Sequence, residues 1–189
     1  YFAFMDTSEY QKSRSWSAYA SGKYQAAGFD AKLGYAISDT NRDSFDPSFG
    51  TDPTFSSKGR SERIGLNGNI YLNRDSSIKL GAENVHDSYQ TGPFGSSGST
   101  GSKGAYVLFD MAQTYGGWNS HAVAIGARVD DHKQFGTHAS FGANGRFFFT
   151  HWVSLRGSMQ TGFKAPTLFQ LLSDFGNTAL EPEKSFGFD

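Results

Sequence analysis

Apolar and polar residues alternate with a period of two along most of this chain. Between residues 29 and 38, Phe29, Leu33 and Ile37 fall on one face of an extended strand, whereas Asp30 and Lys32 fall on the other. The same alternation returns in windows 16–20, 64–72, 78–82, 105–111, 123–129, 141–149 and 153–159. The pattern predicts about eight full β-strands, with partial strands at both ends of the chain.

Charged residues in these windows keep to one of the two registers. The register that holds Leu33, Val107, Ile125 and Leu155 carries no charge, although charged residues make up 19% of the chain. A Lys or Arg that faces lipid costs about 2–4 kcal/mol at the bilayer midplane, so a membrane barrel excludes charge from one face. A soluble β-sandwich also alternates, with its apolar face turned inward, and the period alone does not separate the two.

The connections between the predicted strands differ in length in a regular way. Short ones are expected at 24–27, 73–76, 116–117 and 150–151, and long ones at 39–60, 89–102, 130–137 and 163–183. Short turns on one rim and long loops on the other are typical of outer-membrane β-barrels. We therefore predict an all-β fold, an antiparallel transmembrane β-barrel.

Aromatic residues gather beside the predicted short turns. A ring of amphipathic side chains at the membrane interface would place them there, whereas the general preference of aromatics for strands is the alternative explanation. The residues concerned are Tyr24, Phe29, Tyr71, Tyr115, Trp118, Phe149 and Trp152.

Composition narrows the class further. The chain has 189 residues and a formal net charge of -1, which gives no field to attract nucleic acid. It contains 23 Gly and 16% aromatic residues and no Cys, so disorder, a disulfide scaffold and thiolate metal sites are all disfavoured. No apolar run approaches the roughly 20 residues of a membrane helix.

The last part of the chain contains two boxes of specific residues. Phe163, Lys164, Ala165 and Pro166 form the first, and Asn177, Leu180, Pro182 and Glu183 belong to the second. Between them, Leu168, Phe169, Leu171 and Leu172 are expected to form an apolar cluster folded over the barrel rim.

This pair of boxes resembles the motif of TonB-dependent outer-membrane receptors, in which Phe-Lys/Arg-Ala-Pro precedes Asn-x-x-Leu-x-Pro-Glu. The local amino-acid sequence is most similar to that of cobalamin transporters and related siderophore receptors, although Thr178 stands where the family usually has Pro. Haem receptors of this family carry a His between the boxes, and residues 167–176 contain none.

The resemblance implies a fragment of a larger barrel, of the 22-stranded type and without its plug domain, so that residues 1–189 form part of one barrel domain. It also implies transport of a large scarce nutrient, cobalamin or a ferric siderophore, across the outer membrane of a Gram-negative bacterium. The partners would be outer-membrane lipid, the ligand, and TonB through a plug segment that this stretch lacks. No catalysis is required.

The water-filled interior of such a barrel would be lined by the polar register of the last predicted strands. Its residues are Ser140, Gly142, Asn144, Arg146, Ser154, Arg156, Ser158 and Gln160.

Candidate ligand contacts come from aromatic residues in the predicted outer loops, because flat apolar area suits a large ligand. They are Phe45, Phe49, Phe55, Tyr89 and Phe94. A group of acidic and amide side chains in the first long loop is a hypothetical calcium cage, although such residues are also common in turns. Its members are Asp39, Asn41, Asp43, Asp46 and Asp52.

Two other functions remain open on sequence grounds. One is a complete small barrel that acts as a pore or adhesin. The other is a hydrolase with a site at the barrel rim, for which His86 and Asp87 are the best available pair. Adjacent residues of a strand point to opposite faces, so this pair is not expected to act together.

Overall fold

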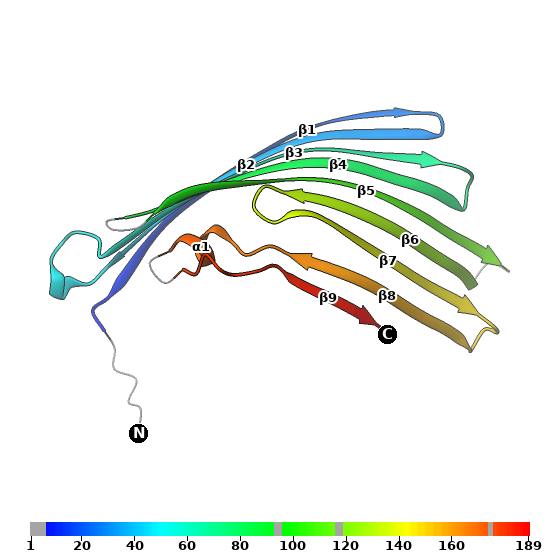
Figure 1. Ribbon diagram of the computed structural model, residues 1–189. Helices are drawn as coiled ribbons and strands as arrows, with labels where there is room; N and C mark the ends of the chain where they lie inside the picture. Colours follow the sequence, from blue (N-terminus) through cyan, green and yellow to red (C-terminus); the bar gives the residue numbers. More distant parts are fainter. Residues whose placement is uncertain (1–6, 93–95, 116–118, 174–175) are drawn as a thin grey trace, which may run out of the picture.

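The chain forms one antiparallel sheet in the computed structural model, which describes residues 7–92, 96–115, 119–173 and 176–189. The strands follow one another in chain order, and each pairs with its neighbours in sequence (Figure 1). They are β1 (Tyr10–Ala26), β2 (Phe29–Phe45), β3 (Phe55–Tyr71), β4 (Ser76–Gly92), β5 (Ser97–Tyr115), β6 (Asn119–His132), β7 (Gly136–Phe148), β8 (Ser154–Lys164) and β9 (Glu183–Phe188). The predicted antiparallel all-β fold is confirmed.

The strands run further than the alternation of the sequence indicates. Each of β1 to β4 has 17 residues, more than the roughly 9–11 that cross a bilayer. The predicted loop at 39–60 was therefore too long, because β2 continues to Phe45 and β3 begins at Phe55. The loops predicted at 89–102 and 130–137 are likewise mostly strand. Both faces are polar in these extensions, so the period of two vanishes while backbone pairing continues.

The two faces of the sheet have opposite character. Leu33, Val107, Ile125 and Leu155 are 53%, 50%, 55% and 61% exposed, whereas Asp30, on the other face, is only 5% exposed. We call these the apolar face and the polar face. Among the described residues, only Leu168 and Leu171 are buried hydrophobic side chains. The apolar face therefore packs on no core within the described part of the chain, and it requires a non-aqueous neighbour.

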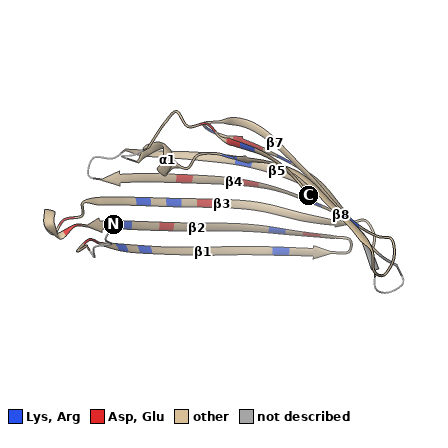
Figure 2. Cartoon of the chain, turned by 90° about the horizontal axis from the view of Figure 1, so that it is seen from below, with Lys and Arg blue, Asp and Glu red and all other residues tan. Residues whose placement is uncertain are grey.

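The apolar face bears charge only toward one end of the strands. On β2 and β3 its first charged positions are Glu62, Asp39 and Arg60, and on β5 and β6 they are Lys103 and Asp131. Between these residues and the short turns lies a continuous apolar band. Figure 2 shows the same distribution on β1 to β4, where most charged positions lie toward the end that carries the 46–54 connection.

Two tight turns depend on glycine. Gly28, between β1 and β2, has a φ of 74°, and Gly136, at the start of β7, has a φ of 73°. Residues with a Cβ rarely adopt this left-handed region, so glycine allows the chain to reverse there. At the same end as Gly28, Phe149 and Trp152 are 70% and 93% exposed, in keeping with an interfacial position. Tyr115 and Trp118 have side chains outside the described part.

A short helix, α1 (Leu168–Leu172), lies over the polar face of β4 and β5, within the curve of the sheet (Figure 1). A single 3-10 turn, η1 (Pro47–Phe49), stands between β2 and β3. In the described residues, no helix has both the length and the apolar character needed to cross a membrane.

Candidate ligand-binding groove

A network of charged side chains crosses the polar face. The Arg128 guanidinium donates to Glu83 Oε1 at 2.5 Å and to both Asp130 carboxylate oxygens at 2.6 and 2.7 Å. Arg63 Nε lies 3.8 Å from the other oxygen of Glu83. Residues from β4 and β6 are thus joined by a partly buried ion pair, and the more exposed Arg63 of β3 adds a longer contact to Glu83.

Nearer the short turns, the polar face carries two smaller clusters. Asp30 accepts hydrogen bonds from the Tyr71 hydroxyl at 2.6 Å and from Asn69 Nδ2 at 2.7 Å. Asp110 accepts one from the Ser77 hydroxyl at 2.8 Å and pairs with Lys79 at 3.0 Å. Tyr71 was expected in the interfacial ring, but its place in the register of β3 puts its side chain on the polar face, where the hydroxyl donates to Asp30.

The helix α1 is fixed both locally and by packing. Thr167 caps it in a capping box: its hydroxyl accepts from Gln170 N at 3.2 Å, and its own N–H donates to Gln170 Oε1 at 2.9 Å. Leu168 and Leu171 are 7% and 5% exposed, and the Phe169 ring meets the Tyr89 ring edge-on at 6.0 Å. The Ser96 hydroxyl donates to the carbonyl of Leu172 at 2.6 Å. The apolar cluster expected over the rim is confirmed, and it covers the polar face of β4 and β5.

A groove of about 560 Å³ runs beneath the start of α1. Its roof is Ala165 to Leu168, and its floor and walls come from β2 to β6. Residues with hydroxyl groups are prominent among those that line it: Ser38, Thr40, Ser61, Ser88, Thr100, Ser102 and Thr167. It is also lined by Arg60, Arg63, Glu83, Val85, Asp87, Tyr89 and His132, of which Arg60 belongs to the apolar-face register.

His132, the last residue of β6, lines this groove and is 9% exposed. Its Nδ1 accepts from the backbone N–H of Gln134 at 3.2 Å, so the proton of the neutral ring is on Nε2. Nε2 lies 3.4 Å from the Thr100 hydroxyl. Burial lowers the pKa of His132, and nearby His138 lowers it further, against the opposing charges of Asp87 and Asp131. His132 is therefore uncharged at neutral pH.

The structure places the predicted ligand contacts in different settings. Tyr89 lines the groove. Phe45 stacks on Tyr10 at 4.8 Å between ring centroids, and Phe49, in η1, is 82% exposed. Phe55 is half-buried at the start of β3, and Phe94 lies outside the described residues. Tyr89 thus lines the groove, whereas Phe45 and Phe49 lie apart from it; the role of all five in binding stays a prediction.

The motif residues build the path from β8 to β9. Phe163 and Lys164 end β8, and Phe163 stacks on the His138 ring at 3.8 Å. Ala165 and Pro166 lead into α1 and line the groove. The chain then returns through Asn177, whose N–H donates to the Gln170 carbonyl at 2.8 Å. Leu180 follows, and its N–H donates to the Asn177 carbonyl at 3.3 Å. After Pro182, Glu183 begins β9 opposite Lys164.

Two of the acidic residues suggested for calcium have hydrogen-bond partners of their own. Asp46 caps η1: it accepts from the Ser48 hydroxyl at 2.5 Å and from the Ser48 N–H at 2.9 Å, and both bonds lower the pKa of Asp46. Asp43 accepts from the Ser56 hydroxyl at 2.6 Å. Within the described ranges, no three acidic, histidine or cysteine side chains converge as a metal site requires. Calcium binding stays a prediction.

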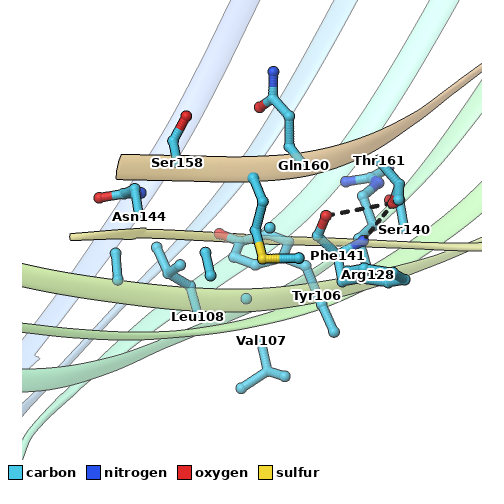
Figure 3. A pocket seen from close by; sticks show the side chains of 16 residues that line it. Tyr106, Val107, Leu108, Arg128, Ser140, Phe141, Asn144, Ser158, Gln160 and Thr161 are labelled. Carbon is cyan, nitrogen blue, oxygen red and sulfur yellow. Dashed lines mark hydrogen bonds between the residues drawn. The ribbon is translucent and has the colours of Figure 1, made fainter. Parts of the chain in front are cut away.

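A second cavity lies where β7 and β8 part. Backbone pairing of these strands stops at Gly142 and Gln160, and the Thr161 hydroxyl then takes over, bonding the Phe141 N–H at 2.9 Å and its carbonyl at 3.3 Å (Figure 3). Ser158 and Gln160 rise on one side of the sheet and Val107 points to the other. The register of β7 and β8 also confirms that Asn144, Arg146, Arg156 and Ser158 share the polar face.

Sequence reasoning missed the association of Asp87, Thr100 and His132. It compared Asp87 with its neighbour His86, but Asp87 faces Ser61 and Thr100 across the sheet, whereas His86 faces Glu62 and Gly101 on the opposite side. The pair therefore does point in opposite directions. The alternation of the strands identifies the inward register of each residue, but it does not give the pairing between strands that joins them.

Comparisons with known proteins identify one family and several structures of similar fold. A family model described as "TonB dependent receptor-like, beta-barrel" matches residues 2–189. The siderophore receptor PirA from Pseudomonas aeruginosa has a TM-score of 0.76 at 19% identity, over 93% of this chain and 34% of that one. PirA from Acinetobacter baumannii has a TM-score of 0.73 at 18% identity, over 94% and 32%. A variant of the ferric enterobactin receptor PfeA from Pseudomonas aeruginosa has a TM-score of 0.73 at 18% identity, over 95% and 31%. This chain spans about a third of the length of these structures.

Proposed function

Since this chain belongs to the TonB-dependent receptor family, as part of the β-barrel domain, we propose that it takes part in TonB-dependent uptake of a ferric siderophore. The family resides in the outer membrane of Gram-negative bacteria, which explains the exposed apolar face. The observation that carries the proposal is the match of the family model over residues 2–189.

The siderophore is preferred over cobalamin as the cargo. Several structures similar to this chain are described as siderophore receptors, and PfeA has been solved in complex with enterobactin. The chemistry of the groove is also compatible with a chelate, because hydroxyl groups bond to its oxygen atoms without covalent change. No observation on this chain favours cobalamin separately.

The residues of this chain would act by binding and positioning. The groove beneath α1 would hold the ligand on the polar face, with Thr40, Thr100 and Ser102 as hydrogen-bonding groups. The ion-paired wall formed by Arg63, Glu83 and Arg128 would keep that surface rigid. Energy for release into the periplasm would come from TonB, through a plug domain.

Uptake of radioactive iron tests this function. A strain that lacks the receptor gene should fail to accumulate iron supplied as its ferric siderophore, and the cloned receptor should restore uptake only when TonB is present. Cobalamin uptake is measured in parallel. Restored cobalamin uptake without iron uptake would contradict the siderophore assignment, and uptake that persists without TonB would contradict the transport mechanism.

A further inference from the structure

We propose that the groove beneath α1 selects an electrically neutral ferric chelate of the hydroxamate type and disfavours polyanionic catecholate chelates. This inference rests on the proposed function and specifies its substrate class. Three hydroxamate groups, with one negative charge each, neutralise a ferric ion. Three catecholates, with two charges each, leave the complex with three negative charges.

The cations near the groove do not leave it with a surplus of positive charge. Arg60 belongs to the apolar-face register of β3, where it donates to Glu62, on the same face, at 2.5 and 2.8 Å. Arg63 lies 3.8 Å from the Glu83 carboxylate, which Arg128 also binds. The two guanidinium charges of Arg63 and Arg128 are thus balanced by the carboxylates of Glu83 and Asp130.

Asp87 gives the groove a negative character. Its half-buried side chain lies on the polar face between Ser61 and Thr100, and among the described contacts it has no ion-pair partner. His132, which lies beyond Thr100, does not compensate for it, since burial keeps the ring neutral. A polyanion in this groove would meet an unpaired carboxylate, and like charges brought together in a partly desolvated site cost several kcal/mol.

The remaining polar groups suit a neutral ligand. A hydroxyl both donates and accepts, so the side chains of Thr40, Ser61, Thr100 and Ser102 match the carbonyl and N–O oxygens of a hydroxamate. Val85, Tyr89 and Leu168 add apolar surface for the linking chain of such a chelate. The groove therefore offers hydrogen bonds and apolar contact without a surplus of positive charge.

Binding to the intact receptor in detergent tests the proposal. Dissociation constants are measured by tryptophan fluorescence for a neutral ferric trihydroxamate, a ferric tricatecholate and cobalamin. We expect the trihydroxamate to bind at least about tenfold more tightly than the tricatecholate. Equal or tighter binding of the tricatecholate would overturn the selectivity while leaving siderophore transport in place. Failure of both chelates to bind would overturn the proposed function as well.

Asp87→Asn identifies the source of the selectivity. Removing the carboxylate should tighten tricatecholate binding by about tenfold and change trihydroxamate binding by less than about twofold. Asp87→Glu keeps the charge and should keep the preference. His86→Gln, one residue away on the opposite face, is the matched control and should alter neither constant. If Asp87→Asn leaves the ratio of the two constants unchanged in a receptor that still folds, Asp87 is not the selective group and the proposal fails.

Discussion

Glycines on the polar face leave room for larger side chains to lie flat against the wall. A Cβ added at Gly81 would come within 2.5 Å of Tyr106 Cε1, and one at Gly34 within 2.8 Å of the Tyr19 hydroxyl. Tyr106 reaches over Gly81 and donates to Asn67 Oδ1 at 2.8 Å. The two glycines thus give Tyr106 and Tyr19 the space to lie across neighbouring strands on the polar face.

Gly81→Ala should destabilise the intact receptor by about 1–3 kcal/mol, because the new methyl group displaces the Tyr106 ring and breaks its bond to Asn67. Urea unfolding in lipid vesicles, followed by tryptophan fluorescence, measures the loss. Gly22→Ala, where a Cβ meets nothing within 4 Å, is the control and should change the unfolding free energy by less than about 0.5 kcal/mol. In a Tyr106→Ser background the cost of Gly81→Ala should largely disappear; an undiminished cost would contradict this steric explanation.

At the scale of elements, two segments at the loop end of the strands depend on single side chains. The β6–β7 hairpin turns through residues 133–135, where the Gln134 N–H is held by His132 Nδ1 at 3.2 Å. The helix α1 is held on β4 and β5 by Leu168 and Leu171. Both contacts lie beyond the apolar band, since Asp131 already carries a charge on the apolar face.

The β6–β7 hairpin should loosen as the pH falls. The pKa of His132 is lowered in the folded state, so the unfolded chain takes up a proton first, near pH 6.5. The contribution of His132 to stability is complete above that pH, and it decreases as the pH falls toward the pKa that His132 has in the folded state. Amide exchange of Gln134 should accelerate in that window in the wild type. The rate in His132→Gln should follow only the intrinsic pH dependence of exchange, and a wild type that behaves in the same way would refute the titration.

Leu171→Asn should detach α1 without unfolding the barrel, because it places a polar amide where an apolar side chain is 5% exposed. We expect limited proteolysis near residues 165–182 to speed up by about tenfold, while the resistance of the receptor to dissociation in detergent is kept. Thr178→Ala, exposed in the same connection, should have no effect. If the detached variant still binds its ferric siderophore with the affinity of the wild type, the groove beneath α1 is not the ligand site.

At the scale of the whole molecule, the sheet has one apolar side and one polar side, which we expect to face lipid and an aqueous interior, respectively. The side chains that carry this assignment are distributed over the entire chain, from Leu33 on β2 to Leu155 on β8. Because the chain contains no Cys, single cysteines introduced on either face can be labelled selectively.

Spin labels at Ile125→Cys and Leu155→Cys should be quenched by lipid-soluble oxygen, and labels at Asn144→Cys and Ser158→Cys by a water-soluble nickel chelate. The physical reason is that alternate residues of β6 to β8 lie on opposite faces of the sheet, and in a membrane barrel these faces meet lipid and the interior. Electron paramagnetic resonance in vesicles measures both accessibilities. The reverse pattern, or equal accessibility on both faces, would rule out the membrane orientation.

Local chemistry made the central parts of the strands predictable. Side chains of an extended backbone point alternately to its two faces, so Leu33 and Asp30 could be assigned to opposite sides without knowledge of any neighbouring strand. The residues around α1 were also recognised, because prolines and a cluster of leucines interrupt the pattern. The strand ends were not predicted, since Thr40, Asn41 and Arg42 are polar on both faces and give no contrast.

The amino-acid order is thus enough to show which side of each strand is apolar and where the chain leaves the sheet, because both depend on neighbours within a few residues. The groove depends instead on contacts between residues far apart in the chain. Asp87, Thr100 and His132 meet through the registers of β4 with β5 and β5 with β6, and α1 reaches β4 by folding back over the sheet. Strand register and the path of a long connection are set by the packing of the assembled sheet, and no local pattern encodes them.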